Sequence, residues 1–189
     1  MAASDDVPIL FKKPLASGGA STDEYMAYRR TILPGTVWED VMIQWFDDLT
    51  VGMRYKGGEA EVTRDDIKRF AAEFDPQPFH LDEAAAEKSM FKGLAASGWH
   101  TAAIAMRLAV ALRPFGPHPL LGLAVDELRW LAPVRPGDVL RIEGEVVELT
   151  PSRTKPQGTA RVKWTVYNQN DEPVLTFTPT VIVPRLPNS

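Results

Sequence analysis

The segment from Gly98 to Arg113, GWHTAAIAMRLAVALR, constrains the fold most because it is apolar on almost every side. Its charged residues are Arg107 and Arg113, and Pro114 follows it directly. Its 16 residues predict a helix about 24 Å long that ends before the proline. A helix that is apolar all round needs cover on most sides. The rest of the chain is therefore expected to wrap around this helix.

The chain after this helix alternates apolar and polar residues with the period of two that is typical of half-buried strands. Such strands are predicted in LLGLAVDELRWL (120–131), VLRIEGEVVEL (139–149), ARVKWTVYN (160–168) and VLTFTPTVIV (174–183). A further strand or strand pair is predicted in VGMRYKGGEAEV (51–62), before the helix. These elements predict an α+β fold in which one curved antiparallel sheet is wrapped around one long central helix.

The chain divides into three parts by pattern. Residues 1–46 form a predicted N-terminal extension, and its first 22 residues are expected to be mobile because they hold prolines and a Gly/Ser cluster. The later part of the extension contains Trp38, Val41, Trp45 and Phe46, which need an apolar surface to pack on. The domain is expected over 47–184, with a C-terminal tail over 185–189.

Composition excludes several classes of function. The chain has 189 residues, of which 44% are hydrophobic, so it can form one domain with a real core. A net charge of −4 predicts no general affinity for nucleic acid or an anionic membrane. The absence of cysteine excludes disulfides and thiolate chemistry. No run is long enough for a membrane span, and the start lacks a signal-peptide pattern, so a cytoplasmic protein is expected.

The stretch FDPQPFHLD, from Phe74 to Asp82, carries the chemistry. Its two prolines predict a rigid loop rather than the interior of a helix or a central strand. Asp75 and His80 are therefore held at a fixed separation before any ligand arrives. A carboxylate and an imidazole on one loop can share a single water. Taken alone, however, Asp75 fits a turn residue and His80 fits a packed core histidine.

Two helices are predicted on either side of this loop. TRDDIKRFAAEF (63–74) has Thr63 as its cap and Asp66 at the third helical position. DEAAAEKSMF (82–91) begins at Asp82, which is expected to cap a short second helix. His100 and His118 are expected to be structural or solvated.

Three motifs in this order resemble the MaoC-like dehydratases, a family that includes the R-specific enoyl-CoA hydratases. The first is Asp75-Pro76-Gln77-Pro78-Phe79-His80, which matches the family's Asp-x-Asn-Pro-x-His segment with Gln in place of Asn. The second is Gly98 in LAASGWH, and the third is WLAPVRPGDVL (130–140). The resemblance covers about residues 47–184 and implies a hot-dog fold. The chain departs from the family pattern at Gln77, at Trp99-His100, and at Met106, where hydratases often have a small hydroxyl residue.

The resemblance implies a hydratase or dehydratase that adds water across the double bond of a 2-enoyl thioester. Asp75 and His80 would hold the water. The Gly98 N–H, free at the positive end of the helix dipole, would bind the thioester oxygen. Gln77, Ser97 and Trp99 are expected to contact the substrate. No metal and no organic cofactor is expected.

The implied partner is an acyl-CoA or acyl carrier protein thioester, and neither nucleic acid nor membrane. Basic residues at the pocket mouth would meet a phosphorylated ligand, and Lys88, Lys92, Arg153 and Lys155 are the candidates. An incompletely covered helix and open sheet edges predict a homodimer or a higher homo-oligomer.

Two alternatives remain open from the residues. A hot-dog thioesterase usually needs a carboxylate on the central helix, and residues 98–113 contain no Asp or Glu. A non-catalytic acyl-CoA-binding protein or structural partner would keep the fold with an idle Asp/His pair.

Overall fold

The structure is a computed structural model that describes residues 43–186. The expectations for residues 1–42 and 187–189 lie outside the described residues. The described elements follow one another along the chain as the turn η1 (Phe46–Asp48), β1 (Arg54–Glu61), α2 (Arg64–Phe74), α3 (Pro78–Leu81), α4 (Glu83–Lys88), α5 (Gly98–Leu112), β2 (Leu121–Trp130), β3 (Val139–Pro151), β4 (Gln157–Tyr167) and β5 (Pro173–Pro184).

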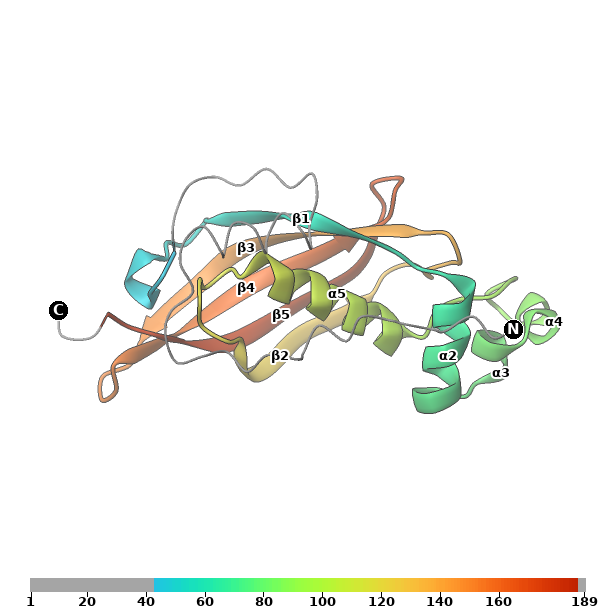
Figure 1. Cartoon of the computed structure of the whole chain (residues 1–189), viewed down its shortest axis with the longest axis horizontal. Helices are drawn as coiled ribbons and strands as arrows, with labels where there is room; N and C mark the ends of the chain where they lie inside the picture. Colours follow the sequence, from blue (N-terminus) through green and yellow to red (C-terminus); the bar gives the residue numbers. More distant parts are fainter. Residues whose placement is uncertain (1–42, 187–189) are drawn as a thin grey trace, which may run out of the picture.

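The strands form one antiparallel sheet in the order β1-β3-β4-β5-β2. Figure 1 shows the twisted sheet with α5 lying along one face, and α2, α3 and α4 gathered beyond one end. The alternation of strands β3 and β4 turns Leu140, Ile142, Val162 and Val166 into the core. This is the predicted arrangement of a sheet wrapped around a single helix.

Helix α5 ends as its sequence predicts. Arg113, its C-cap, adopts a left-handed conformation with φ 47°, and Pro114 cannot continue the helix. One face of α5 is buried against the sheet and includes Ile104, Leu108 and Leu112. The opposite face is not covered by the described residues, so the expectation of cover on most sides is met only in part by a single chain.

Two predictions were adjusted by the structure. Of the strand or strand pair predicted over 51–62, the structure forms a single strand, β1 (Arg54–Glu61), and its register shifts between Gly57 and Glu59, where two glycines have positive φ. The proline-rich stretch is not a loop throughout, because Pro78 starts the short helix α3. Proline is well tolerated at the first helical position, where its missing N–H has no intrahelical partner to lose.

The described part of the predicted extension packs on the domain. The Phe46 ring is buried in the core, and a Cβ at Gly158 in β4 would overlap with it. Asp47 accepts a hydrogen bond from Arg185 Nε at 2.9 Å. The turn η1 therefore fixes the start of the domain to the neighbouring ends of β4 and β5.

We predict that Phe46→Ala lowers the free energy of unfolding by about 3 kcal/mol, because it leaves a cavity that the rigid sheet cannot fill. Denaturant unfolding measures the loss. The control is Val147→Ala, since Val147 is an exposed side chain of the sheet. Equal stability of the two variants would show that Phe46 does not belong to the core.

Candidate active site

Asp75 lies where α2 ends. It is the C-cap residue, with φ −150° and ψ 67°, and its N–H donates to Ala71 O at 3.0 Å. Pro76 excludes the helical conformation for the residue before it, so the helix stops at this point. The carboxylate is thereby carried on the end of a capped helix rather than on a free loop. The predicted cap is confirmed, because the Thr63 side chain accepts from the Asp66 N–H at 3.1 Å.

His80 lies on α3 and is almost completely buried. Its Nδ1 is 2.7 Å from Ala95 O. A carbonyl oxygen can only accept, so Nδ1 carries the hydrogen and donates to it. In the neutral ring, Nε2 is then left with its lone pair free. The imidazole is also packed edge-on against Phe79, with ring centroids 4.6 Å apart.

The two candidate groups meet in space. His80 Nε2 lies 3.5 Å from Asp75 Oδ2. The other bonds of the carboxylate are fixed, because Ser97 Oγ donates to Oδ2 at 2.6 Å and Gln77 Nε2 donates to Oδ1 at 2.7 Å. Burial raises the pKa of Asp75, but the two hydrogen bonds and the nearby His80 outweigh it and leave that pKa lowered. The carboxyl is therefore ionised at neutral pH.

The start of α5 lies beside this pair. Ser97 is the N-cap residue, and its Oγ accepts from the Trp99 N–H at 3.2 Å. Gly98 is the first helical residue, so its N–H has no intrahelical acceptor. A Cβ on Gly98 would come within 2.7 Å of the Trp130 indole. Trp130 Nε1 also donates to Gly98 O at 2.8 Å.

Trp130 was not singled out as a site residue from the sequence. It lies on β2, and its contact joins residues 32 apart in the chain. No local sequence pattern predicts a contact between residues this far apart in the chain. The structure gives a reason for glycine at position 98 that sequence reasoning missed, since the space of the absent side chain is filled by an indole.

The PVRPGD turn is hydrogen-bonded to the segment that precedes α5. Ala96 N–H donates to Val134 O at 2.8 Å. The Arg135 guanidinium donates to Gly93 O at 2.8 Å and also contacts Phe91 O and Leu94 O. These bonds fix the segment that carries Ala95 O, the acceptor for His80. The turn motif thus fixes the position of Ala95 O, which accepts the hydrogen bond from His80.

The other predicted site residues have different positions. Gln77 is exposed and bonded to Asp75, while Trp99 is exposed and packs edge-on against Trp130. Asp82 caps α4 as predicted, since its Oδ1 accepts from the Ala85 N–H at 2.7 Å. The basic candidates do not gather at one place. Lys88 and Lys92 lie at α4, whereas the β3–β4 hairpin that carries Arg153 and Lys155 is at the opposite end of the sheet (Figure 1).

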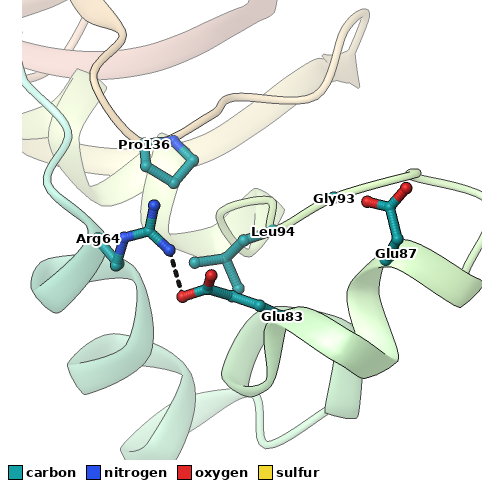
Figure 2. A pocket seen from close by; sticks show the side chains of 6 residues that line it. All are labelled: Arg64, Glu83, Glu87, Gly93, Leu94 and Pro136. Atoms are coloured by element: carbon teal, nitrogen blue, oxygen red, sulfur yellow. Dashed lines mark ion pairs between the residues drawn. The ribbon is translucent and has the colours of Figure 1, made fainter.

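A small surface pocket of about 250 Å³ lies between the start of α2, helix α4 and the turn after β2. Figure 2 shows its lining, which is Arg64, Glu83, Glu87, Gly93, Leu94 and Pro136. Arg64 and Glu83 form an ion pair with each other across it. Because its main charges are already paired and neither Asp75 nor His80 lines it, we assign no ligand to it.

Residues 43–186 hold no group of three or more His, Asp or Glu side chains placed to bind a metal ion. Within the same described range, no helix has both the length and the apolar character needed to cross a membrane.

Comparison with known proteins identifies the family. The family model described as "MaoC like domain" matches residues 48–168. The chain belongs to the MaoC-like dehydratase family. It is 45% identical to the MaoC-like dehydratase of Rhodospirillum rubrum, with a TM-score of 0.69 over 76% of this chain and 98% of that one. This structural likeness confirms the hot-dog fold.

Two curated relatives extend the comparison. The chain is 35% identical to the uncharacterized protein YdeM of Bacillus subtilis, over 74% of this chain and 98% of the relative. It is 31% identical to the 3-hydroxybutyryl-CoA dehydratase of Methylorubrum extorquens, over 77% of this chain and 88% of the relative. The second of these relatives and the family model point to hydratase or dehydratase chemistry, while the name of the first gives no activity.

A second histidine of this MaoC-like domain is buried near the site without taking part in it. His100 stacks on Phe70, with ring centroids 4.8 Å apart, and its Nδ1 has no hydrogen-bond partner among the described residues. Burial lowers its pKa, Asp66 raises it, and Arg69 and Arg107 lower it, so the net shift is downward. The folded protein therefore keeps His100 neutral.

We predict that this histidine makes the fold sensitive to mild acid. Its unfolded-state pKa is about 6.5, so below that pH the unfolded chain binds a proton that the folded chain resists. The contribution is fully present above pH of about 6.5 and is lost as the pH falls toward the lowered folded-state pKa. Unfolding free energies measured for wild type and His100→Phe should differ in slope between about pH 6.5 and 5. Parallel curves over that range would contradict the prediction.

Proposed function

We propose that this chain is a hydratase or dehydratase of 2-enoyl thioesters, with Asp75 and His80 as its catalytic pair. The observation that carries the proposal is a distance: Nε2 of His80 lies 3.5 Å from Asp75 Oδ2, and in the neutral ring, whose Nδ1 donates to Ala95 O, both of these atoms are acceptors. Two acceptors in this arrangement favour a molecule that donates a hydrogen to each. A water does so, and its lone pairs then point away from both groups.

The chemistry of such a water fits addition to an enoyl thioester. Its oxygen forms a bond to the β-carbon while His80 Nε2 takes one of its protons. The ionised Asp75 stabilises the imidazolium that forms, and the proton then passes to the α-carbon. The product is the 3-hydroxyacyl thioester, so one water is consumed and nothing else is needed. Dehydration uses the same groups in reverse.

The negative charge that develops on the thioester oxygen needs a donor. The Gly98 N–H is suited to this role because it is the first N–H of α5 and lies at the positive end of the helix dipole. In the present structure the Trp130 indole occupies the side of Gly98 where a Cβ would be. We therefore propose that the thioester oxygen approaches Gly98 along the direction of its N–H bond and not from the side of the absent Cβ.

The proposed substrate is an acyl group carried on CoA or on an acyl carrier protein. The name of the Methylorubrum extorquens relative, 3-hydroxybutyryl-CoA dehydratase, supports a CoA thioester with a short chain. Gln77 and Ser97 are less suited to direct substrate contact than the sequence indicated, because both donate to Asp75. Trp99, exposed beside the start of α5, keeps that proposed role.

We predict that Asp75→Asn and His80→Gln each lower turnover of crotonyl-CoA at least about a hundredfold, the usual range for removing one acid–base group. The assay follows loss of the absorbance of the conjugated thioester. Because both groups act on one water, the double variant should be little worse than the worse single variant. Thermal melts of the variants should show a folded protein.

The matched controls are Asp65→Asn, on the exposed first turn of α2, and His118→Gln, whose ring contacts Gln44 O instead of the site. Both should keep full turnover. Full turnover in His80→Gln would contradict the proposed pair. Release of free CoA thiol would indicate a thioesterase, and binding without turnover would indicate an acyl-CoA-binding protein.

A homodimer is part of the same proposal. The uncovered face of α5 exposes Trp99, Met106 (43%) and Val110 (48%). Strand β2, whose Trp130 contacts Gly98 at the start of α5, is an edge strand of the sheet, and its apolar residues Leu121, Leu123 and Val125 are exposed. An edge strand has unpaired backbone groups that can pair with the same strand of a second copy about a two-fold axis. Such a copy would cover both surfaces at once.

We predict that sedimentation at micromolar concentration shows a species of at least twice the 20.9 kDa of one chain. Met106→Asp should shift it toward the monomer, because the change buries a charge at the proposed contact. Val51→Asp is the control, since Val51 is also an exposed apolar residue but precedes β1 at the opposite edge of the sheet. A single monomer peak for wild type would refute the homodimer.

A further inference from the structure

The side chain of Ser97 connects the end of α2 to the start of α5. Its Oγ accepts from the Trp99 N–H at 3.2 Å and donates to Asp75 Oδ2 at 2.6 Å. The direction of both bonds is fixed, because a backbone N–H can only donate and an ionised carboxylate can only accept. The hydroxyl hydrogen of Ser97 is therefore committed to Asp75.

The two donors to Asp75 differ in whether water could replace them. Gln77 is exposed, so a water can take the place of its amide on Oδ1. Ser97 has no exposed surface, so no solvent molecule reaches Oδ2 from its side. Removing the hydroxyl would leave that lone pair of Oδ2, in a partly buried place, without its donor. The carboxylate would then be held only by the exposed Gln77 amide, which water can replace, so its side-chain torsion would be less restrained.

The oxygen that Ser97 holds is the one nearest to the histidine. Oδ2 accepts from Ser97 and also lies 3.5 Å from His80 Nε2. With one lone pair of Oδ2 taken by the hydroxyl, the other remains for a donor shared with His80. Ser97 thus decides which part of the carboxylate faces the imidazole.

We propose that Ser97 is a positioning residue, which holds the Asp75 carboxylate in the orientation required for it to act with His80. This inference rests on the proposed function for its catalytic consequence. It replaces the direct substrate contact that the sequence indicated for Ser97. Asp75 accepts a hydrogen bond from Ser97 that lowers its pKa, which agrees with a donor aimed at the ionised form.

The competing explanation is that Ser97 serves only as the cap of α5. Two substitutions separate the roles, because glycine is nearly as good an N-cap as serine while alanine is poor. Ser97→Gly and Ser97→Ala both remove the hydroxyl, but only Ser97→Ala also loses most of the capping preference. A pure cap predicts that Ser97→Gly behaves like wild type and that Ser97→Ala is less stable.

The positioning role predicts a different result. Both variants should lower kcat for crotonyl-CoA by about tenfold to a hundredfold, the range for loss of a hydrogen bond to a charged group. KM should change little, because Ser97 does not touch the substrate. The pKa of Asp75, followed by ¹³C NMR of the side-chain carboxyl, should rise in both variants, since the hydrogen bond that favours the ionised form is gone.

Ser89→Ala is the matched control, because it removes a half-buried hydroxyl that bonds only to backbone groups, Ala86 O and the Phe91 N–H. It should leave kcat and the Asp75 titration unchanged. Wild-type kcat and an unshifted Asp75 pKa in Ser97→Gly would overturn the inference. If Ser97→Ala does not fold, Ser97→Gly alone decides.

The NMR titration keeps this inference distinct from the proposed function. If wild type turns over no enoyl thioester but the Asp75 pKa rises in Ser97→Gly, the proposed function fails and the Ser97–Asp75 coupling stands. If wild type is active and Ser97→Gly keeps both its kcat and its Asp75 titration, the proposed function stands and the positioning role fails.

Discussion

The burial of one apolar helix determines the arrangement of everything else in this protein. The face of α5 that carries Ile104, Leu108 and Leu112 can leave water only if a sheet curves around it. The sheet covers this face along most of the helix, and Trp130 of β2 contacts Gly98 at the helix start. The first N–H groups at that end have no intrahelical acceptor, and Ser97, in the segment before α5, caps one of them, the Trp99 N–H.

The helices beyond the end of the sheet, and the segment that joins them to α5, therefore help to stabilise the start of α5. Segment 91–97 is bonded to the turn after β2 through Arg135 and Val134, and it delivers Ser97 as the cap of α5. The same segment presents Ala95 O to His80, which determines the tautomer of the ring. The groups that stabilise the helix start are thus next to the groups that could do chemistry.

The surroundings of α5 differ in polarity between the start of the helix and its exposed face. One end holds an ionised Asp75 with donors on both oxygens and a histidine with a free nitrogen beside it. The long open face, by contrast, is apolar, and the edge strand β2 also exposes apolar side chains. The polar, preorganised end is where we propose the reaction, and the apolar side surface is where we propose that a second copy binds.

The sequence by itself predicted the elements whose signals are local. The apolar run of α5, the period-two strands, the caps Thr63 and Asp82, and the proline-fixed Asp/His spacing all depend on neighbours within a few residues, where propensity and periodicity act. The family resemblance then indicated the hot-dog fold, which the structural comparison confirmed.

Tertiary structure alone decided the contacts between distant segments. Trp130 fills the space beside Gly98. Arg135 binds Gly93 O in the segment that leads to Ala95, the acceptor for His80. Ser97 donates its hydroxyl hydrogen to Asp75. Each joins residues 22 to 42 positions apart, and each depends on how two packed elements are oriented. Sequence periodicity fixes which face of an element is buried, but the direction of a single hydrogen bond across the core is set only when all the elements are packed together.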